Sequence, residues 1–208
     1  LYGHQWTKGL KRLLTEGASF PLAAYPHSAT KTCPGHTTIG TGLLPRTHGM
    51  IDNTWFDRPS GKSINCTDDP AATSVPFGGG PGTEHHSARL LLQPTFTEYL
   101  RRQRSSPTRV VSLSLKARSA IGLAGRPGPG VMPVWEEASG TFATSNAYTS
   151  EPWPEVERFV RANPMTAAFV ETWTRLLPES QYLFVDDGPG EARDAIFPHP
   201  FRTDTGKP

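Results

Sequence analysis

The stretch ATKTCPGHTTIGTGLLPRTHGM, residues 29–50, is too rich in Thr, Gly and Pro for an ordinary core element. Pro34 suits the first position of a helix, because the N–H that proline lacks has no helical partner there. The pattern therefore predicts a short helix over 34–43, with Thr32 just before its N-terminus. Free backbone N–H groups and the positive end of the helix dipole favour anions at that place, where a hydroxyl can meet a phosphate. The alternative is a Thr that only caps the helix.

The composition is that of a globular chain with many loops. Of the 208 residues, 36% are hydrophobic and 19% are charged, while 21 Pro and 20 Gly predict frequent turns. The net charge is only +2, and the basic residues Arg101, Arg102 and Arg104 fall at an expected helix end, so nucleic-acid binding is disfavoured. No apolar run approaches the roughly 18 residues of a membrane span. We expect no membrane span and no signal peptide in this chain, and its start at Leu1 without Met predicts a fragment or a trimmed product.

The order of the expected elements predicts a layered α/β fold. Trp6, Leu10, Leu13 and Leu14 recur at helical spacing and predict an amphipathic helix that packs on a core and stops at Gly17. The remaining expected elements are helices over 94–104, 154–162 and 164–177, strands over 108–118, 131–135, 140–144 and 181–185, loops over most of 58–88, and an irregular tail over 188–208.

The expected strand over 108–118, TRVVSLSLKAR, alternates strictly from Val111 onward. Its apolar side chains point to one side, and Ser112, Ser114, Lys116 and Arg118 point to the other. Two cations therefore share the polar face at the end of the strand. On spacing alone, they are equally well explained as solvated surface charges.

Other motifs carry weaker signals. The SGKS sequence at 60–63 lacks the glycine of a P-loop, because Phe56 stands in its place, and the glycine run at 77–82 follows no clear strand. Cys33 and Cys66 are compatible either with one disulfide, which would stiffen the turn beside Thr32, or with two buried thiols.

Two segments carry a resemblance to a known family. TKTCPGHTTIGTGLLPRTHGMIDNTWFD, residues 30–57, resembles the nucleophile segment of the alkaline phosphatase superfamily, in its type I phosphodiesterase/nucleotide pyrophosphatase branch. SLSLKARSAIGLAGR, residues 112–126, resembles the Lys-x-Arg segment of the Thr-dependent, PafA-like alkaline phosphatases. The resemblance implies an α/β, alkaline-phosphatase-like layered fold with a central, mostly parallel sheet flanked by helices, here incomplete. Residues 1–208 would form part of the catalytic domain, and 58–150 would include cap or insert loops.

The resemblance also implies a site. Thr32 matches the nucleophile, whose oxygen is bound to one of two zinc ions, and Asn53 matches the Asn that contacts a phosphoryl oxygen. Lys116 and Arg118 match the cationic pair that reaches the non-bridging oxygens. The other zinc ligands of the family are Asp and His residues that lie outside this chain, so Thr32 is the one metal ligand expected here.

The remaining candidate ligands are interpreted as structural or non-catalytic. His36 and His48 are expected to shape the nucleophile turn by hydrogen bonding. The adjacent His85 and His86 are not spaced like zinc ligands and are interpreted as surface residues. Asp186 and Asp187 match a loop of the family that is not catalytic, so neither is included in the expected site.

The function implied is a zinc-dependent phosphate monoester hydrolase that acts on small phosphate esters through a phospho-Thr intermediate. A phosphodiesterase or nucleotide pyrophosphatase of the same superfamily is one alternative, and a non-catalytic protein that binds an anion at Thr32 is another. The Lys116 and Arg118 pair discriminates between the two enzymes, because a monoester dianion needs more positive charge than a diester monoanion. A periplasmic or extracellular location is implied by the resemblance alone.

Overall fold

The computed structural model describes residues 3–103, 108–137, 141–164, 171–184, 186 and 197–200. Its helices are η1 (Gly3–Gln5), α1 (Gly9–Glu16), α2 (Thr32–Thr41), α3 (Pro45–His48), α4 (Phe96–Gln103), α5 (Ala117–Ala124), α6 (Pro154–Ala162) and η3 (Glu179–Gln181). Its strands are β1 (Thr54–Asp57), β2 (Lys62–Asn65), β3 (Ser74–Pro76), β4 (Val110–Leu113), β5 (Val131–Glu136), β6 (Phe142–Ser145), β7 (Thr172–Trp173) and β8 (His199–Pro200). Within these residues, no helix has both the length and the apolar character that crossing a bilayer requires.

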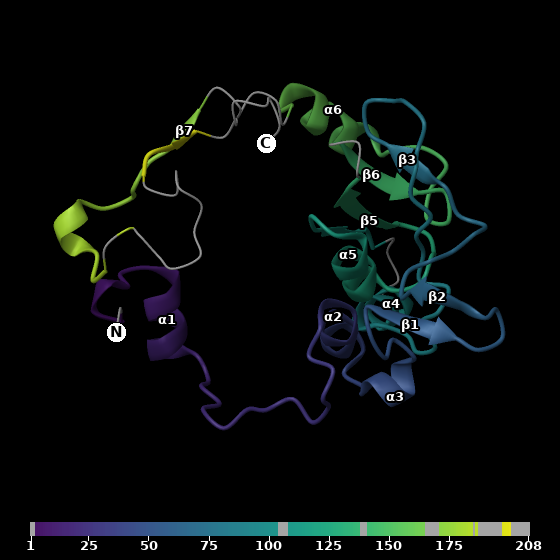
Figure 1. Ribbon diagram of the computed structural model, residues 1–208, viewed down its shortest axis with the longest axis horizontal. Coiled ribbons are helices and arrows are strands. Elements are labelled where there is room, and N and C mark those ends of the chain that lie inside the picture. The colour runs from purple at the N-terminus through teal and green to yellow at the C-terminus, as the bar shows by residue number, and fades with distance from the viewer. Residues whose placement is uncertain are drawn as a thin grey trace.

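The main body is built on a four-stranded sheet in the order β3-β6-β5-β4. β4 and β5 run parallel, whereas β6 is antiparallel to both β5 and β3. The α/β class is confirmed, but the described sheet is mixed, not mostly parallel as expected. A separate antiparallel hairpin, β1–β2, lies beside this body, and helices α2 and α5 pack together below the sheet (Figure 1).

The core lies between α5, the sheet and the nucleophile segment. One buried cluster contains Cys33, Met50, Cys66, Ala88, Leu91, Ala117, Ile121 and Trp135. A second, smaller cluster of Phe77, Met132 and Val134 lies on β5 and the loop after β3, and the side chains of α6 pack against it. Because β5 contributes to both clusters, its first five residues are all buried. This burial explains why VMPVW reads as a continuous apolar run.

The expected helices over 94–104 and 154–162 and the strands over 131–135 and 140–144 are confirmed as α4, α6, β5 and β6. The expected helix over 34–43 exists as α2, but it begins at Thr32, two residues early. Pro34 is therefore its third residue, which a helix tolerates because the N–H groups of the whole first turn lack helical partners.

The terminal regions correct several expectations. Helix α1 forms as predicted but buries none of its residues, so the prediction that it packs on a core is wrong within the described chain. The helix expected over 164–177 is wrong at 171–177, where Thr172 and Trp173 instead pair with β8, and residues 165–170 lie outside the described part. The strand expected over 181–185 is wrong at 181–184, where η3 ends, and residue 185 lies outside. Of the tail, only 197–200 are described.

The expected strand over 108–118 ends early. β4 stops at Leu113, and α5 begins at Ala117, so Lys116 and Arg118 flank the first residue of a helix and do not share a strand face. The physical reason is burial: Ala117, Ala120, Ile121 and Ala124 recur at helical spacing and are all buried.

Candidate functional site

Thr32 is the first residue of α2 and is half-buried. Lys31, which precedes it, has an extended backbone and its side chain does not cap the helix. The first-turn N–H of Cys33 is bound instead by Asn53, whose Oδ1 accepts it at 2.8 Å. An N-terminal helical N–H needs such an acceptor because it has no partner within the helix. The structure thus brings Thr32 and Asn53, predicted from separate parts of the motif, to the same helix end.

This hydrogen bond also fixes how the Asn53 amide is turned. A side-chain amide has one acceptor oxygen and one NH₂ donor group. With Oδ1 directed at the Cys33 N–H, the Nδ2 group is left to donate elsewhere. That orientation suits a residue that has to donate to an anionic oxygen near Thr32.

Cys33 and Cys66 form a disulfide, with Cα atoms 6.6 Å apart. Of the two possibilities that the sequence left open, the structure therefore has the disulfide. Both cysteines are fully buried, and the backbone N–H of Cys66 donates to the main-chain oxygen of Asn53 at 3.0 Å. Asn53 is consequently bound by both half-cystines, one at its side chain and one at its backbone.

A cavity of about 260 Å³ adjoins Thr32, the candidate nucleophile. It is lined by Tyr25, Thr30, Lys31, Thr32, Gly35, His36 and Ile39. Lys31 Nζ lies 2.9 Å from the carboxylate of Asp52, and this hydrogen bond holds the pKa of Asp52 below its usual range. Lys31 adds a cation directly before the helix start. No role was predicted for Lys31 from the sequence, although TKTCPGH has this Lys directly before the candidate nucleophile.

Lys116 and Arg118 lie at the start of α5. The backbone N–H of Lys116 is 3.3 Å from Ser114 Oγ, and both cations line a cavity of about 130 Å³ together with Asn65, Thr67, Glu84, His86, Leu115, Ala117 and Glu136. Thr32 does not line this cavity. The Lys-x-Arg pair therefore lines a second cavity, whose lining shares no residue with that of the cavity beside Thr32.

The two cavities nevertheless share one supporting helix pair. Gly40, near the end of α2, lies against Gly122 and Leu123, near the end of α5, and a Cβ on Gly40 would approach the Gly122 carbonyl oxygen to 2.3 Å. At the other ends, Cys33 and Ala117 belong to the same buried cluster. Thr32 and Lys116 therefore lie at the N-terminal ends of two helices that pack together, and helix N-termini favour anions.

A polar network that the sequence did not predict supports the second cavity. Glu84 Oε2 accepts a hydrogen bond from Trp135 Nε1 at 3.0 Å and lies 3.2 Å from His86 Nε2. Thr67 Oγ1 lies 3.1 Å from His86 Nδ1. His86 is therefore half-buried within a structural network, and not a simple surface residue. No signal in the sequence joins these residues, because Glu84 and Trp135 are far apart along the chain.

The two histidines of the nucleophile segment are confirmed as structural hydrogen-bonding groups. His36 Nδ1 donates to the Thr32 carbonyl oxygen at 2.8 Å. His48 is fully buried; its Nδ1 accepts from the Met50 N–H at 3.1 Å, and its Nε2 lies 3.2 Å from Thr38 Oγ1. Burial, with a smaller effect from the nearby His27, lowers the pKa of His48 to about 4.

The described residues do not form a metal centre by themselves. Among them, no group of three or more His, Cys, Asp or Glu side chains is arranged to hold a metal ion, so Thr32 remains a single potential ligand. Asp186 instead accepts a hydrogen bond from the Phe197 N–H at 2.7 Å and pairs with Arg175. Asp187 lies outside the described residues.

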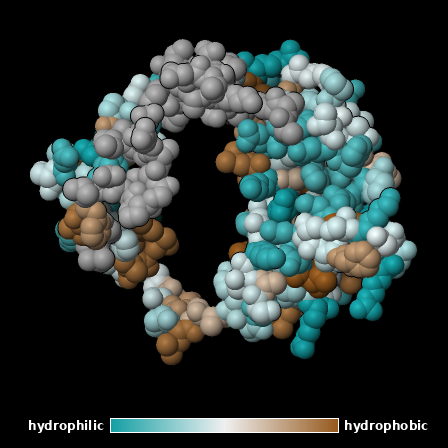
Figure 2. Space-filling view, viewed as in Figure 1, coloured by the Kyte–Doolittle hydropathy of each residue, from teal (hydrophilic) through white to brown (hydrophobic). Residues whose placement is uncertain are grey.

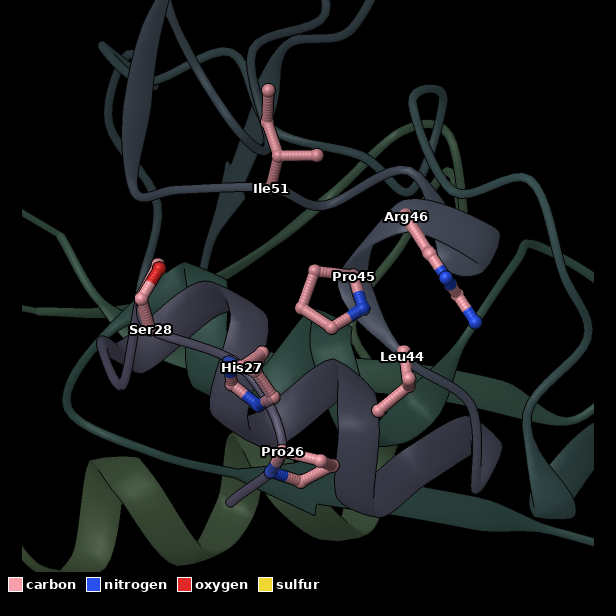
Figure 3. Close-up of a pocket in the computed structure, with 8 residues that line it drawn as sticks. Pro26, His27, Ser28, Leu44, Pro45, Arg46 and Ile51 are labelled. Atoms are coloured by element: carbon pink, nitrogen blue, oxygen red, sulfur yellow. The ribbon is translucent and has the colours of Figure 1, made fainter.

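A larger cavity of about 450 Å³ lies between the segment before α2 and helix α3 (Figure 3). It is lined by Pro26, His27, Ser28, Ala29, Leu44, Pro45, Arg46 and Ile51. None of the four predicted site residues lines it, so cavity size does not identify the candidate site in this chain.

Comparisons with known proteins give a consistent result. Residues 1–174 match the model of the type I phosphodiesterase / nucleotide pyrophosphatase family. The chain is 36% identical to the alkaline phosphatase PafA of Elizabethkingia meningoseptica, over 84% of this chain and 32% of that protein. It is 30% identical to the alkaline phosphatase PhoV of Synechococcus elongatus, over 97% of this chain and 37% of that protein.

A solved structure shares the fold. It is an alkaline phosphatase PafA variant in which one Thr, one Asn, one Lys and one Arg are substituted, and it superposes with a TM-score of 0.72 at 31% identity, covering 83% of this chain and 34% of that one. The chain thus spans about a third of the length of the relatives that it matches.

Proposed function

The chain belongs to the type I phosphodiesterase / nucleotide pyrophosphatase family, and from this membership we propose that it carries the nucleophile and oxyanion-binding segments of a phosphate monoester hydrolase. The observation that carries the proposal is the pairing of Thr32 with Asn53 at the start of α2. In the substituted phosphatase variant, the Thr and the Asn are separated by as many residues as Thr32 and Asn53, and the Lys and the Arg are spaced as Lys116 and Arg118 are. This spacing supports the same four residues as the site.

In the proposed reaction, Thr32 Oγ attacks the phosphorus of a small phosphate ester in line with the departing alcohol. The bond from phosphorus to the ester oxygen breaks, the alcohol leaves with that bonding pair, and a phospho-Thr intermediate forms. Water then displaces Thr32 and releases inorganic phosphate. Asn53 Nδ2, Lys116 and Arg118 would hold the non-bridging oxygens, on which charge gathers in both steps.

Zinc dependence belongs to the same proposal for the complete enzyme, which would hold two zinc ions. A Thr hydroxyl is a weak nucleophile at neutral pH, and a metal bound to its oxygen favours the alkoxide. Because the described residues offer Thr32 alone, they do not fit a zinc centre by themselves, and no step is assigned to the metal here. The isolated 208 residues should therefore bind zinc poorly and turn over no substrate; zinc-dependent hydrolysis by this chain alone would contradict that expectation.

A phosphodiesterase or nucleotide pyrophosphatase is the second candidate, favoured by the description of the matching family. Thr32 and Asn53 would serve either enzyme, whereas Lys116 and Arg118 favour the monoesterase. A non-catalytic protein that binds an anion at Thr32 is the third candidate. A periplasmic or extracellular location is also proposed, and the Cys33–Cys66 disulfide supports it because such bonds persist mainly in oxidising compartments.

The test compares hydrolysis of p-nitrophenyl phosphate and bis-p-nitrophenyl phosphate by the full reading frame that encodes this chain. We expect the parent to prefer the monoester. Thr32→Ala should lower kcat for monoester hydrolysis at least about 10³-fold, because loss of the nucleophile removes the covalent route. Thr41→Ala, at the other end of α2, is the matched control and should stay within about twofold, as expected for a residue outside the chemistry. A diester preference would favour the second candidate, and no activity on either ester would favour the third.

A further inference from the structure

The hairpin that leads to Cys66 is weakly packed for an element beside a candidate active site. β1 and β2 pair only with each other, and none of their residues is buried. Trp55 of β1 packs against the cluster that contains Cys33 and Cys66, and the hairpin is also held at its base, where Asn53 and Cys66 lie. Cys66 itself is fully buried in the same cluster as Cys33 and Ala117.

Helix α2 is held quite differently. Gly40 packs closely on α5, and four residues of α2 are buried. Thr32 thus lies on an element fixed to the sheet, whereas Asn53 lies at the base of an exposed hairpin. A catalytic group and an oxyanion donor must keep their relative position to within a fraction of an ångström to act together.

The backbone hydrogen bonds that join these two parts converge on one disulfide. The Cys33 N–H donates to Asn53 Oδ1, the Cys66 N–H donates to the Asn53 main-chain oxygen, and the Cys33–Cys66 bond closes the ring. The other link at this point, between Lys31 and Asp52, is an exposed ion pair, and exposed pairs contribute little because solvent screens them.

We propose that the Cys33–Cys66 disulfide is a positioning element of the catalytic site, which holds the Asn53 amide in register with Thr32. The inference rests on the proposed hydrolase function. Loss of the disulfide should therefore lower kcat more than a loss of folding stability alone would. Substrate binding through Lys116 and Arg118 is expected to change little, because both cations lie at the start of α5, outside the covalent ring.

The experiment compares the double variant Cys33→Ala/Cys66→Ala with Leu91→Ala in the full reading frame. Leu91 is buried in the same cluster but takes no part in the disulfide or in its hydrogen bonds to Asn53, so Leu91→Ala reports the loss of packing alone. Steady-state hydrolysis of p-nitrophenyl phosphate gives kcat and KM, and amide hydrogen exchange is followed for a peptide covering residues 30–37.

The double variant should lose about tenfold or more in kcat, with KM within about twofold, because misplacement of a positioned group lowers the rate of the chemical step. Its exchange over 30–37 should accelerate. Leu91→Ala should lower Tm while leaving kcat and that exchange close to the parent. Equal loss of kcat in both variants, or unchanged kcat in the double variant, would overturn the proposal.

Two outcomes need separate readouts. If the parent hydrolyses neither ester, the proposed function has failed. The positioning role of the disulfide is then judged by hydrogen exchange alone: acceleration of exchange that is specific to the double variant supports this role, and no acceleration refutes it.

If the double variant does not fold, the folded parent is reduced with a trialkylphosphine, which is oxidised to its oxide as the disulfide takes up two electrons and two protons. A loss of activity that follows thiol formation and is reversed on reoxidation supports the positioning role of the disulfide. Full reduction without loss of activity refutes it.

Discussion

Helices α1 and α5 each contain eight residues, but α5 buries six of them and α1 buries none. Helix α1 has the more regular amphipathic pattern, yet Leu10, Leu13 and Leu14 are 56%, 67% and 59% exposed. Figure 1 shows α1 apart from the sheet, and Figure 2 shows apolar side chains uncovered along it and along the segment that follows.

The difference between the two helices lies in their partners. Helix α5 presents Gly122 to α2, and the missing side chain allows the two helices to approach closely. Helix α5 also packs on β4 and β5. A Cβ on Gly122 would already lie 3.1 Å from Thr37 Oγ1. An apolar stripe therefore specifies that a helix forms, but burial requires a surface of matching shape. The candidate site lies on the helix pair for which that surface is present.

The largest expected effect tests whether the start of α5 contributes to function. Replacement of both Lys116 and Arg118 by Ala should lower kcat/KM for a monoester about 10²-fold or more, since each removes a donor to developing negative charge. The loss for a diester should be far smaller. Parallel assays with p-nitrophenyl phosphate and bis-p-nitrophenyl phosphate in the full reading frame measure both, with Arg102→Ala on α4 as the control. Equal losses on the two esters would remove the assigned role.

The next effect concerns folding stability. Ile121→Ala on α5 should destabilise the protein by about 2–5 kcal/mol, because the Ile121 side chain is fully buried and its loss leaves a cavity. Leu13→Ala on α1 should cost less than about 0.5 kcal/mol in the 208-residue chain, as for other exposed positions. Urea unfolding of both variants checks this. A large cost at Leu13 would show that α1 is covered in solution, contrary to the structure.

A smaller effect tests the contact between α2 and α5 directly. Gly40→Ala should cost about 2–3 kcal/mol, because the new Cβ would overlap the Gly122 carbonyl and force the helices apart. Gly35→Ala, in the same helix, meets no atom within 4 Å and should be neutral or slightly stabilising. Chemical denaturation curves give both values, and similar costs at the two glycines would argue against the close packing.

The smallest effect is the pH dependence of folding stability that arises from His48, the last residue of α3. The pKa of His48 is lowered from 6.5 to about 4, so folding favours the neutral ring. The stability that the neutral His48 ring contributes is therefore complete above pH 6.5, the pKa in the unfolded chain. This stability is lost as the pH falls from 6.5 toward about 4, the pKa in the folded protein. Between pH 7 and pH 5 the parent should lose roughly 2 kcal/mol more stability than His48→Gln. Unfolding at both pH values tests the difference, and an equal loss of stability in the parent and in His48→Gln would contradict it.

Much of the local structure was predictable from residues close together in the chain. Helices α4 and α6 and strands β5 and β6 follow their patterns, and the family resemblance correctly implied the α/β class. The strand predicted over 108–118 was too long because two patterns overlap there. The alternation of apolar and polar residues continues to residue 118, while buried residues repeat at helical spacing from Ala117 to Ala124. Packing on α2 decides between them, and alternation alone does not contain that information.

For the candidate site, the resemblance selected Thr32, Asn53, Lys116 and Arg118, and their catalytic roles remain predictions. The network of Glu84, His86 and Trp135 was not predictable, since its members lie on different elements and no spacing relates them. The interaction of Lys31 with Asp52 was missed for the same reason.

The sequence by itself determined several helices and strands, among them α4, α6, β5 and β6, and placed a Thr at the start of a short helix, because periodicity and first-turn preferences depend on neighbours along the chain. Only the tertiary structure decided that Cys33 pairs with Cys66, that Asn53 Oδ1 caps α2, and that α5 is buried while α1 is not. Each of these depends on contacts between residues far apart in sequence, whose geometry is fixed only when the elements pack together.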